Sequence, residues 1–485
     1  MRTHMMWLVL MAFVIGGSAA AQKPDRSAPP KLGPPPVLRM GEIQHLKLAN
    51  GLKVILYEKH SVPLVQINLL VRAGSVCDPA DEPGLASMTG SMMMEGAGNR
   101  DALALSDAVD YLGAGLGVNT GYHTFDVSLN VPVTKLDSAL SLMADVALRP
   151  TFSQADFDRK KTELLTSLLQ WRDVPRMLAN VLLNRSIFGG HPYGIPSIGT
   201  EQSLQKLTPV ELKAFHEKYF VPTLATLVVV GDVTASTIMP KLKASFGKWK
   251  GTTPELPRLP ETHQVDSLRI LLVDKPGAPQ SVIIIGRVGV PRLTPDYYPI
   301  VVLNSILGGS FSSRLNMNLR ERHGYTYGAG SRFDFRPLPG PLYAVAAVQS
   351  AVTDSSLIEF MNELRGIVTS PPSDAEVERA RNFIALSFPS DFQTVNQIAG
   401  QLEEMALYNL PDDYFNNYID RILSVTTEQT GVVAKKYIDP SKMIVVIVGD
   451  RAQIEQKIVN LHFGPVTVLS VDDVLGKAPV LGTSH

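Results

Sequence analysis

The stretch KYFVPTLATLVVVGD, residues 218–232, recurs in the second half of the chain as KYIDPSKMIVVIVGD, residues 436–450. In both copies Pro follows Tyr after three residues, Gly follows it after twelve, and Asp comes directly after the Gly. Upstream, segments 54–59 and 270–275 resemble each other, and in both a Pro follows the last Lys at the same distance. Because the agreement holds at both ends of a repeat of about 217 residues, the sequence predicts two homologous domains.

This repeat sets the predicted domain boundaries. Residues 43–250 form the first domain and residues 266–468 the second, each with about 200 residues. The proline-rich segment 251–265 is the predicted linker between them, and residues 469–485 are a tail.

Within each half the hydrophobic pattern alternates between strand and helix. Residues 65–71 and 125–131 place apolar side chains at every second position, whereas residues 101–112 and 154–171 carry them at helical spacing. In the second half we expect strands over 281–285 and 342–348 and helices over 298–307, 357–368 and 374–386. The pattern predicts an α+β fold of two homologous domains, each an antiparallel-rich sheet covered by helices.

The N-terminus is typical of an export signal. Arg2 precedes an apolar run over residues 5–15, and the small residues Ala19-Ala20-Ala21 predict cleavage before Gln22. The apolar run is too short for a bilayer, which needs about 20 residues, and no later segment is apolar enough to span one. We therefore expect a signal peptide over 1–21, a proline-rich leader over 22–42, and a periplasmic or secreted protein without a membrane span.

Charge and cysteine content narrow the possible partners. The chain has 45 basic and 46 acidic residues, a net charge of −1, so nothing favours nucleic acid as a partner. Cys77 is the only cysteine and cannot form an internal disulfide. We expect it to be a small buried side chain rather than a reactive thiol.

Three stretches resemble the M16 peptidases, the family of insulinase and the processing peptidases. They are residues 50–54 with 72–75, residues 191–194 with the helix start at 207–209, and residues 308–315 with 319–328. The third stretch is the most specific, with GGSFSSRL followed by LRE and GYTYG. The resemblance runs from about residue 43 to 465, and it implies the duplicated fold inferred above.

Active M16 members carry the motif His-x-x-Glu-His just after a Gly-Leu-Ala turn. The two imidazoles bind zinc, and the Glu takes a proton from the zinc-bound water. Here the turn is Gly84-Leu85-Ala86, but the motif positions hold Ser87, Gly90 and Ser91. The resemblance therefore implies a degenerate zinc site and a chain that does not cut peptides by itself.

The family's third zinc ligand is a Glu on a later helix. Its position falls near Thr166 or Ser167, and neither is acidic. Glu163 lies one helical turn earlier, but a lone carboxylate without histidines is better explained as a solvated helix residue. We expect no metal or other cofactor on this chain.

By this resemblance, the chain retains two of the family's site residues, Arg320 and Tyr327. They match the Arg and Tyr that M16 enzymes direct toward the zinc site of the facing half, where a guanidinium and a phenol can donate to the substrate carbonyl and the oxyanion. The structural alternative is that Arg320 pairs with Glu321 and Tyr327 begins a strand.

These losses and retentions predict a pseudoenzyme: the zinc-less subunit of a heterodimeric M16 peptidase. It would form half of a peptide-binding chamber and supply Arg320 and Tyr327 to a partner that carries the zinc. The peptide substrate would add a strand near residues 115–121 or beside the strand after Tyr327. One alternative is a non-enzymatic peptide-binding or scaffold protein on the same fold. A zinc-independent hydrolase is disfavoured, because the chain has no Gly-x-Ser-x-Gly motif.

Overall fold

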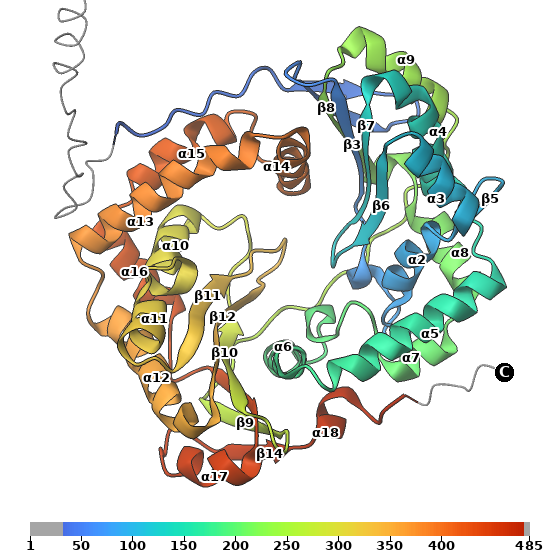
Figure 1. Ribbon diagram of the computed structural model, residues 1–485. Helices are drawn as coiled ribbons and strands as arrows, with labels where there is room; N and C mark the ends of the chain where they lie inside the picture. The colour runs from blue at the N-terminus through green and yellow to red at the C-terminus, as the bar shows by residue number, and fades with distance from the viewer. Residues whose placement is uncertain (1–32, 480–485) are drawn as a thin grey trace, which may run out of the picture. The chain divides into compact units, whose positions relative to one another are not determined.

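A computed structural model describes residues 33–479 of the chain (Figure 1). The predicted signal peptide and most of the predicted leader, residues 1–32, lie outside the described residues. From Pro36 onward the chain forms one compact unit. Within residues 33–479, no helix combines the length and the apolar character needed to cross a bilayer.

The first half of the chain forms a six-stranded sheet in the order β1-β2-β8-β3-β7-β6. Its strands are β1 (Gln44–Lys47), β2 (Lys53–Glu58), β3 (Leu64–Val71), β6 (Gly115–Thr120), β7 (Phe125–Pro132) and β8 (Ala225–Gly231). Only β2 and β8 run parallel, and every other neighbouring pair is antiparallel. The predicted alternation in β7 is confirmed, because every second side chain from Phe125 to Val131 is buried.

The second half forms another six-stranded sheet, in the order β11-β12-β10-β13-β9-β14. Its strands are β9 (Arg269–Asp274), β10 (Gln280–Val288), β11 (Thr326–Phe333), β12 (Pro341–Gln349), β13 (Ile444–Gly449) and β14 (Val466–Leu469). Strand β9 runs parallel to both β13 and β14, and the other neighbours are antiparallel.

The duplication seen in the sequence recurs in the strand register. In the first sheet β2 and β8 pair in parallel with Glu58 opposite Gly231, and in the second β9 and β13 pair in parallel with Asp274 opposite Gly449. The outer strands differ: β1 precedes β2 and is antiparallel to it, whereas β14 comes from the end of the chain. The predicted α+β class, with two related halves and antiparallel-rich sheets, is confirmed.

Helices pack around both sheets, and most predicted helices are present. Those of the first half are α2 (Leu85–Met93), α3 (Ala102–Tyr111), α4 (Leu136–Leu148), α5 (Gln154–Trp171), α6 (Pro175–Phe188), α7 (Glu201–Lys206), α8 (Pro209–Tyr219) and α9 (Ala235–Phe246). Those of the second half are α10 (Tyr297–Asn304), α11 (Arg314–Asn316), α12 (Thr353–Thr369), α13 (Asp374–Ser387), α14 (Val395–Tyr408), α15 (Tyr414–Leu423), α16 (Thr427–Tyr437), α17 (Arg451–Val459) and α18 (Val471–Leu475).

The helix predicted over 298–307 ends earlier than expected. Regular α10 stops at Asn304, and the chain continues as a π-helical turn over Ser305–Gly309. The turn presses its backbone against β11, since a Cβ added at Gly308 would lie 2.2 Å from the backbone nitrogen of Ser331. Only glycine permits this close approach of the turn to the backbone of β11.

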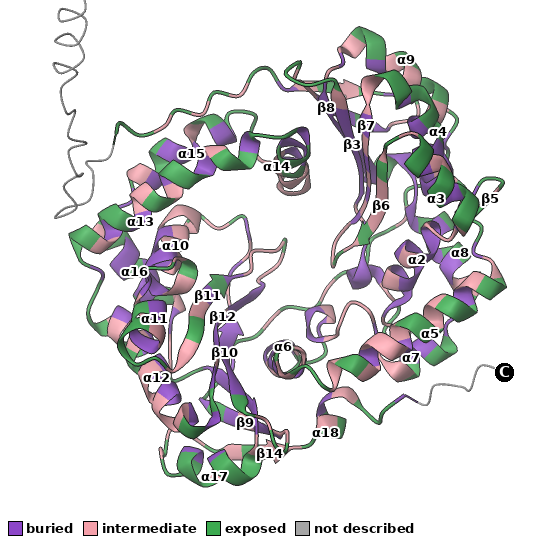
Figure 2. Cartoon of the chain, viewed as in Figure 1, coloured by how far each residue is buried: buried purple, intermediate pink, exposed green. Residues whose placement is uncertain are grey.

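The two halves exchange equivalent helices. Helix α6 of the first half packs on β10 and β13 of the second sheet, and helix α14 of the second half packs on β3 and β8 of the first (Figure 1). Each hydrophobic core therefore draws residues from both halves: Ile284 and Val446 belong to the core of the first half, and Ile55 and Val228 to that of the second. Figure 2 shows the strands largely buried while the outer faces of the helices are exposed.

Candidate functional site

The turn before α2 depends on glycine. Gly84 has φ +98°, a left-handed conformation, and a Cβ there would lie 2.6 Å from the carbonyl oxygen of Ile198. The carboxylate of Asp78 accepts hydrogen bonds from the N–H groups of Gly84 and Ala86, each at 2.8 Å, and so caps the helix. Burial raises the pKa of Asp78 to about 7, against the opposing effect of these two bonds.

The positions of the degenerate motif on α2 are tightly packed. The hydroxyl of Ser91 donates to the carbonyl oxygen of Ser87 at 2.9 Å, one turn back along the helix. Gly90 faces the sheet, and a Cβ added to it would lie 2.1 Å from Oγ1 of Thr120 and 3.1 Å from the ring of Phe125. The space in which a motif Glu would begin is therefore occupied by side chains of β6 and β7.

The neighbouring helix α5 offers no ligand at the predicted third position. The hydroxyl of Thr166 donates to the carbonyl oxygen of Thr162 at 2.7 Å, and that of Ser167 to the carbonyl oxygen of Glu163 at 3.0 Å. Both hydroxyls thus satisfy the backbone of their own helix. Between residues 33 and 479, no group of three or more His, Cys, Asp or Glu side chains is placed to hold a metal ion.

Glu163 belongs to a surface ion-pair network, as its interpretation as a solvated helix residue predicts. It pairs with Arg159 at 2.7 Å and with Lys160 at 2.9 Å, and hydrogen bonding to Lys160 is the largest cause of its lowered pKa. Glu95, just beyond α2, also pairs with both basic residues. These ion pairs join the end of α2 to α5, and both carboxylates in the network already have basic partners.

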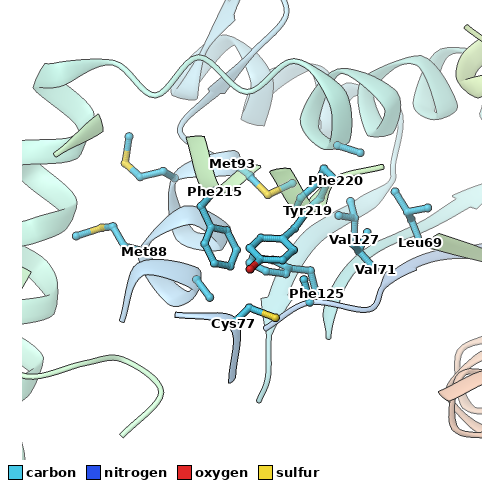
Figure 3. Packing of buried hydrophobic residues seen from close by; sticks show 14 of the residues in the cluster. Leu69, Val71, Cys77, Met88, Met93, Phe125, Val127, Phe215, Tyr219 and Phe220 are labelled. Atoms are coloured by element: carbon cyan, nitrogen blue, oxygen red, sulfur yellow. The ribbon is translucent and has the colours of Figure 1, made fainter. Parts of the chain in front are cut away.

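The methionines of α2 and Cys77 are core residues, as expected. Met88 and Met93 are fully buried in the core of the first half, and Cys77 lies beside Tyr219 in the same core (Figure 3). Burial raises the pKa of the Cys77 thiol, which keeps it protonated and unreactive.

Arg320 and Tyr327 lie at the entry to β11. Arg320 is on a π-helical turn, Met317–Arg322, and Gly324 with φ +66° reverses the chain into the strand. The guanidinium of Arg320 is 4.7 Å from the ring centre of Phe311, and its Nε is 3.3 Å from Oε1 of Glu321. Tyr327, the second residue of β11, is 92% exposed.

Both structural alternatives for this pair of residues are therefore present, the ion pair to Glu321 and the strand start at Tyr327. The ion pair is half exposed, and such pairs contribute little to stability. Neither side chain is needed to hold β11, because the Thr326 hydroxyl donates to the carbonyl oxygen of Ala347 at 2.6 Å and anchors the strand. Both remain free to contact another molecule.

Sequence reasoning missed the aromatic residue beside Arg320. Phe311 is 63% exposed, and Met317, also exposed, lies on the same π-helical turn as Arg320. The signal was a lone Phe within a Gly-Gly-Ser-Phe-Ser-Ser loop, where no core is available for it.

The two strands expected to line a peptide groove are both edge strands. Among residues 33–479, strand β6 pairs only with β7, and β11 pairs only with β12, so each leaves one row of backbone groups unpaired within its sheet. The sequence of β6, Gly-Leu-Gly-Val-Asn-Thr, contains no charge or proline that would discourage strand addition.

Comparison with known proteins agrees with this fold. Residues 53–201 match the family described as Insulinase (Peptidase family M16), and residues 206–384 match Peptidase M16 inactive domain. The chain is 25% identical over 287 residues to the uncharacterized zinc protease YmxG of Bacillus subtilis, covering 59% of this chain and 68% of that one. It is 21% identical over 417 residues to the non-peptidase homolog YmxG of Helicobacter pylori, covering 85% and 96%.

Among solved structures, a peptidase M16 inactive domain from Pseudomonas fluorescens superimposes with a TM-score of 0.79 and 28% identity, covering 84% of this chain and 98% of that one. A protease from Helicobacter pylori gives a TM-score of 0.77 at 19% identity, covering 84% and 99%, which supports the fold alone.

Proposed function

Because the chain belongs to the M16 peptidase family, we propose that it is the zinc-less subunit of a heterodimeric M16 peptidase. In this role it forms half of the peptide-binding chamber and presents Arg320 and Tyr327 to a partner subunit that carries the zinc. The predicted signal peptide supports a periplasmic or secreted location.

The observation that carries the proposal is the packing at Gly90. A chain that had lost only its ligands would leave a space where they stood. Here Thr120 and Phe125 fill the space beside the helix, and the hydroxyl of Ser91 is bonded to the backbone of its own turn. This packing supports a function in which another chain supplies the hydrolytic centre.

Arg320 and Tyr327 supply the chemistry that this chain still offers. A guanidinium and a phenol both donate hydrogen bonds, and both suit the oxyanion that forms when a zinc-bound hydroxide attacks a peptide carbonyl. Their exposure, with Tyr327 at 92%, suits groups that act on a neighbouring subunit. The unpaired edges of β6 and β11 suit an extended peptide substrate held by backbone hydrogen bonds.

The test mixes the purified chain with an M16 chain from the same source that has an intact His-x-x-Glu-His. We expect neither protein alone to cleave an unstructured peptide and the mixture to do so. Arg320→Ala or Tyr327→Phe should lower kcat on the order of 10²-fold, because each removes a donor to the oxyanion. Size-exclusion chromatography should show unchanged complex formation.

Arg322→Ala and Tyr325→Phe are the matched controls, since each lies two residues from its counterpart and should leave kcat within about twofold of wild type. If Arg320→Ala and Tyr327→Phe also retained full turnover, the role in trans would be refuted.

A second candidate is a non-enzymatic binding or scaffold protein on the same fold. It is favoured by the similarity to the relative named a non-peptidase homolog, which extends over 85% of this chain. This function predicts that affinity purification of the native protein recovers a homodimer or a partner without a zinc motif. Recovery of a zinc-bearing M16 chain would exclude it.

A further inference from the structure

The contact between α14 and the first sheet contains a polar site within an otherwise apolar interface. Helix α14 packs on β3 and β8, and the β3 residues Gln66 and Asn68 are each only 3% exposed. Buried amides of this kind need hydrogen-bond partners, so the contacts that they make define the site.

The amides form a directed chain of hydrogen bonds. Nδ2 of Asn130 donates to Oε1 of Gln66 at 3.0 Å, and Nε2 of Gln66 donates to Oδ1 of Asn68 at 2.5 Å. The Asn68 amide is then left to donate to the carboxyl group of Glu403 on α14. The chain of donors thus ends at an acceptor that belongs to the other half of the molecule.

Glu403 and Asp126 of β7 line the same cavity at this point, and each affects the pKa of the other. One oxygen of each, Oδ1 of Asp126 and Oε1 of Glu403, is inaccessible to solvent and lacks a hydrogen-bond donor. Among the ion pairs formed by residues 33–479, none involves either carboxyl group. Two unpaired carboxylates in contact inside a protein are strongly unfavourable, whereas one proton between them gives both oxygens a partner.

We propose that Asp126 and Glu403 share one proton and that this proton latches α14 onto the first sheet, so that the contact opens more readily as pH rises. The inference does not depend on the proposed peptidase role. Burial, and then the charge of Asp126, raises the pKa of Glu403 to about 9, and burial raises that of Asp126 as well.

Neighbouring charges do not neutralise the pair. A cavity of about 520 Å³ adjoins it and gives the proton a route to solvent. The other charged or titratable groups that line this cavity are Arg292, Tyr297, Arg332, Asp334, Glu404 and Tyr408. Arg292 pairs with Glu404 at 2.8 Å, and Asp334 pairs with Arg336 at 2.6 Å, so these charges are already balanced. Arg332 is exposed to solvent.

Arg72 on the first half holds the end of α14 independently of pH. Its guanidinium donates to the carbonyl oxygens of Ala406 at 2.6 Å and Leu407 at 3.3 Å. Arginine stays charged throughout the accessible pH range. The pH dependence of the contact therefore resides in the carboxyl pair.

The direction of the effect follows from proton linkage. In the open state Glu403 is solvated and has its ordinary pKa of 4.5, whereas in the closed state it keeps its proton up to a pH of about 9. Between these values the closed state binds one more proton, so the opening constant rises about tenfold per pH unit. Below this window the latch has its full strength, and above it no further weakening occurs.

Hydrogen exchange of the α14 amides tests the latch, with rates corrected for intrinsic exchange, between pH 5.5 and 8.5. The wild-type chain should show opening that increases about tenfold per pH unit. Glu403→Gln keeps a donor for Asp126 without a titrating proton, so its opening should be nearly independent of pH. Asp126→Asn removes the neighbouring charge but leaves Glu403 buried, so its pH-dependent opening should level off at a lower pH than in the wild type. It provides a second variant if the first does not fold.

Glu404→Gln is the matched control, because it changes the adjacent acid, whose carboxylate pairs with Arg292. It should retain the wild-type pH dependence. A wild-type opening constant that is flat with pH, or the same slope in the wild type and in both pair variants, would overturn the proposal.

Discussion

The guanidinium of Arg336 lies 4.5 Å from the ring centre of Tyr193 and 4.3 Å from that of Tyr122, so a cation from the second half contacts two aromatic rings of the first. Its Nη2 pairs with Asp334 at 2.6 Å, and the Tyr193 hydroxyl hydrogen-bonds to His123. This cluster is a further polar contact between the halves, separate from the carboxyl pair at α14.

Loss of the Arg336 side chain should destabilise the protein. Arg336→Ala removes both cation–π contacts and leaves Asp334 without its partner, so the free energy of unfolding should fall by about 2 kcal/mol in urea denaturation. Arg332→Ala, which changes an exposed arginine on β11 four residues earlier, should alter it by no more than about 0.5 kcal/mol. Equal effects of the two variants would argue against the stacking contribution.

Gly90 should not tolerate a side chain. Gly to Ala within a helix normally stabilises by about 1 kcal/mol, but here the added Cβ meets Thr120 and Phe125. We expect Gly90→Ala to lower the free energy of unfolding by about 1–3 kcal/mol. Thr120→Ala removes the nearest atom, so the double variant should recover part of the loss in a double-mutant cycle. Strict additivity would mean that Thr120 is not the obstacle.

Restoring the motif should not restore a metal site. The triple variant Ser87→His, Gly90→Glu, Ser91→His supplies the missing side chains, but the Glu cannot be placed beside Thr120. We expect elemental analysis to find less than stoichiometric zinc on this variant, and a metal chelator to leave the unfolding temperature of the wild-type chain unchanged. Tightly bound zinc on the wild-type chain would contradict the whole interpretation of α2.

His216 should make the protein sensitive to acid. Its Nε2 is 2.9 Å from the carbonyl oxygen of Ala147, and burial lowers its pKa to about 4. Because the unfolded chain takes up this proton near pH 6.5, the stabilisation is complete above that pH and is lost as pH falls toward 4, by up to about 1.4 kcal/mol per pH unit. His216→Gln keeps a donor to Ala147 and should show a shallower loss between pH 6.5 and 4 in urea denaturation.

Much of the fold could be predicted because it depends on local patterns. The repeated Gly-Asp ends at Gly231 and Gly449 marked the duplication of the two halves, and the alternation from Phe125 to Val131 marked β7. The π-helical turn after Asn304 could not be predicted, because it arises from the close approach of Gly308 to a strand that follows later in the chain.

The loss of the zinc-motif residues could be predicted from the sequence, but the packing around their positions could not. Ser87, Gly90 and Ser91 could be read directly from the motif positions, yet nothing local indicated that Thr120 fills the space beside Gly90. The carboxyl pair was missed for the same reason, since Asp126 and Glu403 are 277 positions apart in the chain and only the packing of α14 brings them together. The roles of Arg320 and Tyr327 remain predictions.

The exchange of α6 and α14 also constrains how the chain can fold during synthesis. All strands of the first sheet have been made once residue 231 is complete, but the helix that covers β3 and β8 spans residues 395–408. Until that helix leaves the ribosome, the face formed by Ile55 and Val228 has no cover, and exposed apolar strands of this kind aggregate. The nascent first half therefore needs protection, by a chaperone or by an export pathway that keeps it unfolded, for the whole time in which the second half is translated.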